Sequence, residues 1–185
     1  RDAHQTTLVS WYALRYDLDL YSNFTYQTAS QGQGNSDQFG QRDQREVLGG
    51  QASHAWVFDG VAHTPMVNTV GVQFRQDRID AGLFDTTQRR ITRTVRDDQV
   101  RQRQLGVFGQ NDSSWHDKLR TVAGLRLDQF IAEVDSRGQA ENSGTSSGYR
   151  VSPKLSVILG PWAATELFVN TGHGFHSNDA RGTTA

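Results

Sequence analysis

The amino-acid sequence predicts an all-β fold: an antiparallel up-and-down segment of a transmembrane β-barrel, with about seven long strands. Three observations predict it. Hydrophobic residues make up only 35% of the chain and aromatic residues 10%, which is too aromatic for a disordered chain and too polar for a large soluble core. Apolar residues recur at alternate positions, and no stretch approaches the roughly 18 apolar residues of a membrane helix. Long and short polar connections alternate along the chain, as they do in transmembrane barrels.

The first strand shows the longest alternation. From Leu8 to Tyr26 the even positions are mostly apolar, whereas the odd positions from Arg15 to Thr25 are mostly polar. A repeat of two residues is typical of a strand, because successive side chains point to opposite faces. About 18 residues would extend about 60 Å, and a tilted membrane strand needs only about 9–11 residues. We therefore expect this strand to cross a bilayer and project beyond it.

Six further strands are expected from the same alternation. In chain order they occupy the segments Leu48–Phe58, Val70–Phe74, Leu105–Val107, Leu119–Leu127, Val151–Leu159 and Leu167–Phe175. The opposite positions of these strands carry polar residues that we expect to face the barrel interior: Arg75, Arg120, Arg126, Asp128, Lys154 and Glu166. As a specific hypothesis, Leu125 and Val157 point to lipid, while Arg126 and Ser156 point inward.

The connections between these strands differ in length. The long polar ones are Gln27–Arg45, Asp85–Gln102, Ser136–Tyr149 and the tail from Ser177, and the short ones are Asp59–Pro65, Asn111–Asp117 and Gly160–Ala164. Short turns at one end and long loops at the other are typical of outer-membrane barrels, in which the first and last strands here would both run outward. Taken singly, each long connection could equally be a flexible surface loop.

Aromatic residues lie beside the short turns. Trp56 and Phe58, Trp115, and Trp162 each fall near one of them. Aromatic rings collect at the two interfaces of a transmembrane barrel, because they have an apolar body and a polar edge. The pattern favours an interfacial girdle, and the alternative is ordinary packing near strand ends.

Composition excludes several function classes. The net charge is -1 and there is no cysteine, so the chain offers neither a basic field for nucleic acid nor disulfides, thiolate metal sites or a cysteine nucleophile. The sequence opens on Arg1 and closes on a polar stretch without an initiator Met or a signal segment. We therefore expect an internal piece of a longer protein.

The candidate chemical sites are weak. His173 and His176 form an H-x-x-H motif, but positions i and i+3 of a strand face opposite sides, so we expect no metal site. The other histidines are expected to be polar surface residues: His4, His54, His63 and His116. No G-x-S-x-G motif and no phosphate-binding loop is present, so we expect neither a catalytic residue nor a cofactor.

A charge-rich run lies in one predicted loop. It contains Arg89, Arg90, Arg93, Arg96, Asp97, Asp98, Arg101 and Arg103. Guanidinium groups bind carboxylates and phosphates bidentately, so this loop could face a ligand or lipopolysaccharide. The favoured interpretation is a solvated rim of mixed charge.

The last third of the chain contains the most specific motifs. It reads Ser152-Pro153-Lys154-Leu155-Ser156, then Gly160-Pro161-Trp162, then the segment from Gly174 to Gly182, GFHSNDARG. This sequence resembles the barrels of TonB-dependent outer-membrane receptors of Gram-negative bacteria. The segments Leu119–Asp128 and Tyr21–Tyr26 look like earlier strands of the same barrel, so the resemblance covers essentially the whole chain.

The resemblance implies a 22-stranded barrel around an N-terminal plug, located in the bacterial outer membrane. Such receptors import siderophore-bound iron, cobalamin and, in some branches, sugars or metals, with energy from the TonB–ExbB–ExbD complex. The implied partners are membrane lipid and lipopolysaccharide, the plug, the remaining strands and a small-molecule ligand. Residues 1–185 would be part of one barrel domain. The chain shows no counterpart of the plug, the TonB box or the C-terminal aromatic strand, which we expect elsewhere in the full protein.

Strand arithmetic agrees with this size. Seven strands in 185 residues amount to about 26 residues for each strand with its connection, so a 22-stranded barrel needs roughly 580 residues. A transport-receptor segment without catalysis is therefore the first hypothesis, and the residues that contact the ligand are unknown. The alternatives are a soluble β-sandwich binding module, which predicts strands of about 5–6 residues, and an outer-membrane barrel enzyme or adhesin.

Overall fold

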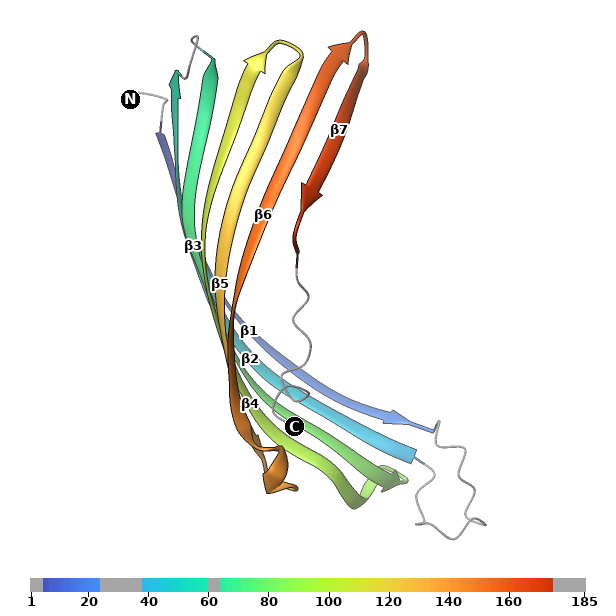
Figure 1. Cartoon of the computed structure of the whole chain (residues 1–185). Helices are drawn as coiled ribbons and strands as arrows, with labels where there is room; N and C mark the ends of the chain where they lie inside the picture. The colour runs from blue at the N-terminus through green and yellow to red at the C-terminus, as the bar shows by residue number, and fades with distance from the viewer. Residues whose placement is uncertain (1–4, 24–37, 60–63, 175–185) are drawn as a thin grey trace.

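A computed structural model describes residues 5–23, 38–59 and 64–174 of the chain. It contains one antiparallel sheet whose seven strands lie side by side in chain order, and Figure 1 shows this sheet as a curved arc. The elements are β1 (Gln5–Ser22), β2 (Gln38–Asp59), β3 (Pro65–Thr87), β4 (Arg90–His116), β5 (Leu119–Ser136), the 3₁₀ turn η3 (Ala140–Asn142), β6 (Gly144–Trp162) and β7 (Thr165–Gly172). The predicted all-β, up-and-down barrel segment is confirmed. No helix in the described part of the chain is long and apolar enough to span a membrane.

The register defines two faces of the sheet. Trp11, Gly50, Phe74 and Leu105 are direct cross-strand partners on β1 to β4, and the side that carries this row is called the outer face. The opposite side, called the inner face, carries the next row: Tyr12, Gly49, Arg75 and Gln104.

The inner face is the inside of the bend. Asp77, Val100 and Asp128 on this face are only 4%, 1% and 0% exposed, whereas Val107 and Leu125 on the outer face are 47% and 56% exposed. Among the described residues no second layer packs against this sheet, so the burial seen on one side comes from the side chains of the sheet itself. They converge on the concave side of a curved sheet and spread on the convex side.

Strand extends into three predicted long connections: it occupies the described part of Gln27–Arg45, all of Asp85–Gln102 except a two-residue turn, and both ends of Ser136–Tyr149. The loop assignment is wrong for these residues. β2 already begins at Gln38, β3 continues to Thr87, and β6 begins at Gly144. The connection between β3 and β4 is a two-residue turn, Gln88–Arg89, with φ angles of 50° and 64°. These are the left-handed values that a tight hairpin turn needs to follow the sheet twist. The predicted alternation of long and short connections therefore fails at this turn.

Other boundaries shift by a few residues. β4 continues to His116 and β6 to Trp162, so the turns fall at residues 117–118 and 163–164. β7 ends at Gly172, and Phe175 lies outside the described residues. So do Phe24, Tyr26 and most of the first and last predicted connections.

The facing of the first strand also needs correction. The apolar even positions of β1, such as Leu8 and Leu14, lie on the inner face, because Leu8 pairs with Ser53 and Leu14 with Val47. The outer face of β1 is apolar only as far as Ala13 and then carries Arg15, Asp17 and Asp19. The alternation of apolar even positions with charged odd positions, which predicted the strand, therefore comes from the second half of β1. There, after Ala13, the outer face is charged and the inner face is apolar.

A small apolar core lies on the inner face. Ile79, Ala81, Val100 and Val134 are 7%, 5%, 1% and 4% exposed and pack together, with Ala132 beside them. They come from β3, β4 and β5 at the level where the outer face is polar. The apolar side of the sheet therefore changes from outer to inner along each of these strands.

Candidate functional site

The inner face carries a repeated ion-pair arrangement within single strands. Arg75 Nε lies 2.8 Å from Asp77 Oδ1, and Arg126 Nη2 lies 2.7 Å from Asp128 Oδ1. Arg96 pairs with Asp98 in the same way. Residues i and i+2 of a strand point to the same side, so an Arg-x-Asp sequence places both charges on one face without help from another strand.

Asp128 is the most fully satisfied of these carboxylates. It is 0% exposed, receives both Nε and Nη2 of Arg126 at 2.8 and 2.7 Å, and accepts a third hydrogen bond of 3.0 Å from Gln104 on β4. The bidentate geometry is the strongest that a carboxylate can form with a guanidinium. These contacts tie β5 to β4 and leave Asp128 no exposed surface for a ligand.

Glycines provide the space in which long inner-face side chains lie flat. A Cβ on Gly106 would stand 2.2 Å from Arg126 Nη2 and 2.6 Å from Asp128 Oδ1. A Cβ on Gly49 would stand 2.3 Å from the ring of Tyr12, and one on Gly71 would stand 2.4 Å from that of Phe108. Each of these long side chains lies across the neighbouring strand at the position of a glycine, so it stays close to the sheet.

The six residues predicted to face inward all lie on the inner face. Arg120 Nε contacts Asp112 Oδ1 at 2.7 Å, and Lys154 Nζ contacts the side-chain oxygen of Gln110 on β4. Cross-strand partners place Arg126 opposite Ser152 and Lys154 opposite Gly124, and alternation along β7 places Glu166 on the same side. Leu125 and Val157 lie on the outer face and Ser156 on the inner face, as the sequence predicts.

The three histidines in the described part of the chain lie apart from one another. His54 Nδ1 lies 2.8 Å from the hydroxyl of Thr7, and its ring centroid is 5.6 Å from that of Trp56. His116 and His173 belong to other strand ends, and His4, His63 and His176 lie outside the described residues. Within the described residues, no three His, Asp or Glu side chains could share a metal ion.

The charge-rich run, apart from Arg89 in the turn, is not a loop but the first half of β4. Arg93 contacts Asp85 at 2.6 Å, and Asp97 accepts from Arg137 at 3.2 Å. Arg137 also contacts Asp80 of β3 at 2.7 Å. That hydrogen bond and the charge of Asp97 raise the pKa of Arg137 above its ordinary value. This end of the sheet is therefore a rim of largely paired, mixed charge.

The outer face has an apolar band between two aromatic rows. Trp56, Trp115 and Trp162 lie on the outer face at the short-turn end, and Trp115 Nε1 donates to Thr121 at 2.7 Å. The side chain of Phe58 lies outside the described part. A second row, which sequence analysis missed, contains Trp11, Phe74 and Tyr149 at 78%, 38% and 73% exposure. The signal for it was the change of the outer positions from apolar to polar, from Ala13 to Arg15 on β1 and from Phe74 to Gln76 and Arg78 on β3.

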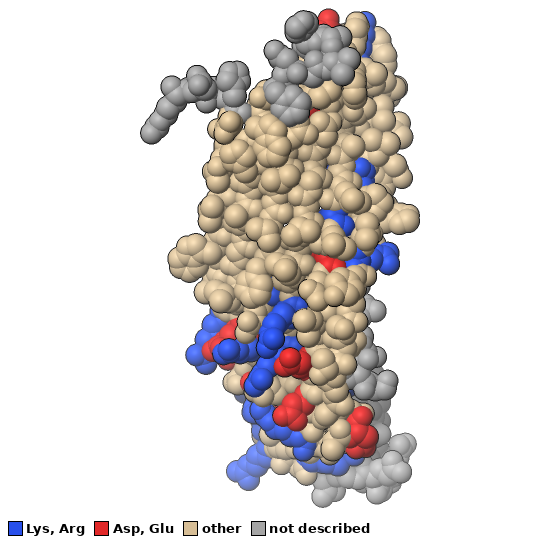
Figure 2. All heavy atoms as spheres, turned by 60° about the vertical axis from the view of Figure 1, so that its left-hand side comes forward, with Lys and Arg blue, Asp and Glu red and all other residues tan. Residues whose placement is uncertain are grey.

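Charged side chains gather beyond the second aromatic row. Figure 2 shows them toward the end of the molecule that carries the Gln88–Arg89 turn, while most of the remaining surface in this view is uncharged. Between Met66 and Phe74 on β3 the outer positions are Met66, Asn68, Val70, Val72 and Phe74. A band of this length matches the roughly 9–11 residues of a tilted membrane strand.

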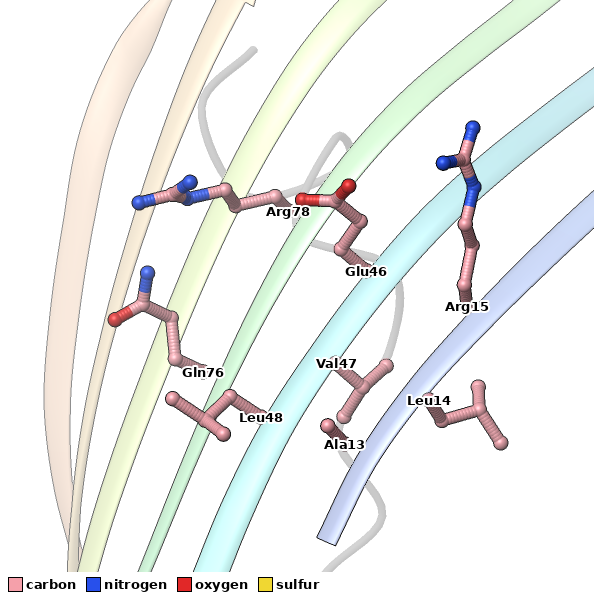
Figure 3. Close-up of a pocket in the computed structure, with 8 residues that line it drawn as sticks. All are labelled: Ala13, Leu14, Arg15, Glu46, Val47, Leu48, Gln76 and Arg78. Carbon is pink, nitrogen blue, oxygen red and sulfur yellow. The ribbon is translucent and has the colours of Figure 1, made fainter.

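A shallow pocket of about 490 Å³ lies at the border between the band and the charged end. Its lining combines apolar and charged residues of β1, β2 and β3: Ala13, Leu14, Arg15, Glu46, Val47, Leu48, Gln76 and Arg78. In Figure 3 the charged groups of Arg15, Glu46 and Arg78 lie on one side and Ala13, Leu14 and Leu48 on the other.

Residues 2–185 match the model of the protein family described as TonB dependent receptor-like, beta-barrel. Comparison with curated protein sequences gives no match. Among solved structures, the unliganded ferric citrate transporter FecA is similar, with a TM-score of 0.73 at 11% sequence identity. That similarity covers 92% of this chain and 25% of the transporter, so the chain spans about a quarter of its length.

Proposed function

Since the chain belongs to the TonB-dependent receptor β-barrel family, we propose that it forms part of the wall of an outer-membrane transport receptor. In this proposal residues 1–185 contribute seven strands to one larger barrel of the 22-stranded type. The plug, the TonB box and the remaining strands come from other parts of the full protein.

The division between the two faces of the sheet supports this function best. The outer face carries a continuous apolar band between two aromatic rows, as a lipid-facing surface does. The inner face carries paired charges and glycine-backed side chains, as a wall around a polar interior does. A soluble β-sandwich would bury one face against a second sheet, and these strands of 18 to 27 residues in β1 to β6 exceed the usual length in such folds.

The transported substance is proposed to be a small, scarce molecule such as siderophore-bound iron or cobalamin, and uptake is proposed to draw energy from the TonB–ExbB–ExbD complex through the full protein. The solved structure that is similar to this chain is a ferric citrate transporter. That similarity is compatible with an iron chelate as the transported substance. Because Asp77, Asp98 and Asp128 are engaged by arginines of the wall, we assign the wall a structural role and ligand selection to other parts of the receptor.

The membrane arrangement can be tested by single-cysteine labelling, because the chain has no cysteine of its own. The complete receptor, with any cysteines elsewhere replaced, would carry Leu125→Cys or Val157→Cys on the outer face and Ser156→Cys or its cross-strand partner Asn170→Cys on the inner face. A charged maleimide applied to outer membranes should label the inner-face pair and spare the outer-face pair. Equal labelling of all four would refute the arrangement.

Transport itself needs a second experiment. Uptake of radiolabelled ferric citrate, a ferric hydroxamate and cobalamin would be measured in cells with and without the receptor, each with and without TonB. The proposal expects receptor-dependent uptake of one probe that disappears without TonB. Receptor-dependent uptake that persists without TonB would refute energised transport while leaving the barrel arrangement intact.

A further inference from the structure

Side chains from three strands and a turn meet at the end of the sheet that carries the Gln88–Arg89 turn. Gln38 begins β2, Thr86 lies near the end of β3, and Asn23 directly follows β1. The ends of β1, β2 and β3 lie together at the lower right of Figure 1. Although Thr86 stands at the end of a single-layer sheet, it is 0% exposed. Side chains of neighbouring segments must therefore cover it.

The side-chain amide of Gln38 joins three parts of the chain. Its Oε1 accepts a hydrogen bond from the Thr86 hydroxyl at 3.0 Å and another from the backbone N–H of Arg89 at 3.1 Å. Its Nε2 donates to Asn23 Oδ1 at 2.8 Å. These partners lie 48, 51 and 15 residues from Gln38 in the sequence, so one amide bridges β3, the turn after β3 and the residue after β1.

The ring of Tyr21 makes a second link between β1 and this turn. The guanidinium carbon of Arg89 lies 5.6 Å from the centroid of the ring, which is a cation–π contact. The ring also lies close to Gly40 of β2, where an added Cβ would stand 3.4 Å from Tyr21 Cε1 and 3.2 Å from Thr86 Cγ2. Since β2 lies between β1 and β3, the turn after β3 reaches β1 across an intervening strand.

The turn has little apolar surface to hold it in place. Residues 88–95 are all exposed, including Ile91 at 50%. Burial of apolar surface therefore contributes little to the position of the turn, and its contacts to Gln38 and Tyr21 are the ones that fix it against the neighbouring strands.

We propose that these residues form a conformational coupling device, called the clasp: Tyr21, Asn23, Gln38, Thr86 and Arg89. The clasp transmits a displacement of the ends of β1 and β2 to the β3–β4 turn, and the reverse. A connected hydrogen-bond network can be worth more than its separate pairs, and here one amide is shared by three bonds. The inference rests on the proposed barrel arrangement, which places this end of the sheet at the outer opening of the receptor.

Amide protection, measured by hydrogen exchange of the complete receptor in lipid vesicles, tests the coupling. Asn23→Ala removes one bond of Gln38 Nε2, while both contacts of Gln38 Oε1 can remain. Protection of the amides of residues 88–90 should nevertheless fall about three- to ten-fold, the effect of losing one hydrogen bond. Arg89→Ala, which removes the contact with the Tyr21 ring, should in turn lower the protection of residues 21–22 and 39–40. If each variant alters only the amides beside its own position, the contacts are local and the proposal is overturned.

Two control variants separate coupling from a general loss of order. Gln44→Ala replaces an exposed glutamine of the same strand and should leave the protection of both groups of amides unchanged. Asn23→Asp keeps an acceptor oxygen for Gln38 Nε2, so it should keep residues 88–90 protected. A loss in either control equal to that in Asn23→Ala would overturn the proposal.

Cysteine labelling of the same variants reports separately on the barrel arrangement. An unchanged labelling pattern together with uncoupled amides would overturn the clasp and leave the proposed function intact. A failure of the labelling pattern in the parent receptor would refute the arrangement itself.

Discussion

Gly106 is predicted to be intolerant of even one added methyl group. In Gly106→Ala the new Cβ would stand 2.2 Å from Arg126 Nη2, 2.6 Å from Asp128 Oδ1 and 2.8 Å from Arg126 Cζ. The guanidinium must therefore move away from β4. In the native structure it lies against that strand, and the Arg126 side chain is 27% exposed. Its departure weakens the bidentate contact to a carboxylate that is fully buried.

The loss of stability in Gly106→Ala depends on which hydrogen bonds of Asp128 remain. Asp128 would keep the 3.0 Å hydrogen bond from Gln104 but lose well-aligned contacts to its countercharge. Leaving a buried polar group under-satisfied costs about 1–3 kcal/mol, and complete loss of a buried partner costs about 3–5 kcal/mol. Because the arginine is displaced rather than removed, we expect about 1–3 kcal/mol. Urea titration of the complete receptor in lipid vesicles, followed by gel mobility with and without heating, measures this difference.

Gly109 of the same strand provides the matched control. A Cβ on Gly109 would meet no heavy atom within 4 Å, so Gly109→Ala should be neutral or stabilising by about 0.4–1 kcal/mol through the reduced freedom of the unfolded chain. A double variant, Gly106→Ala with Asp128→Asn, should show that the two changes are not additive. If Gly106→Ala and Gly109→Ala have the same effect, the stacking of Arg126 on β4 does not stabilise the wall.

Three further outcomes are expected. Leu125→Arg should destabilise the receptor in vesicles by up to about 2–4 kcal/mol, the value for a lipid-facing arginine near the midplane, whereas Ser156→Arg should cost little; equal costs would contradict the assigned facing. Gly71→Ala should cost about 1–3 kcal/mol by overpacking against the ring of Phe108, and Phe108→Ala should remove that cost, so a persistent cost would place the strain elsewhere. Since the pKa of Arg137 is raised, its contribution is complete below the ordinary arginine pKa and is lost only as pH rises through the raised value. Amide protection around Arg137, which is the exchange rate corrected for its intrinsic pH dependence, should therefore stay constant between about pH 6 and pH 9, and it should fall in Arg137→Gln; a change of protection within that pH range in the native protein would refute this assignment.

The sequence predicted the number, order and type of the strands because alternation within the apolar band is strong. It also predicted that Arg126 and Leu125 face opposite sides. It failed at residues 85–102, which form strand and a tight turn. In that region most residues on both faces are polar, and a polar alternation cannot be told from a loop. The Arg-x-Asp pairs were missed although the two-residue repeat alone places both charges on one face. The glycine sites were missed because they depend on register, which places Gly106 opposite Asp128 and beside Arg126.

The change of apolar face along β3 and β4 explains both the successes and the failures. Within the band, Phe74 and Leu105 are apolar on the outer face; a few residues further, Ile79 and Val100 are apolar on the inner face. A sheet whose outer side meets lipid needs no core there. Where the same strands project into water, the apolar residues must be covered by one another, and only the concave side brings them together. In the proposed membrane arrangement, the phase of the two-residue repeat therefore reverses at the membrane border, at the level of Arg78 and Arg101. A prediction that assumes one phase for each strand ends the strand at that point.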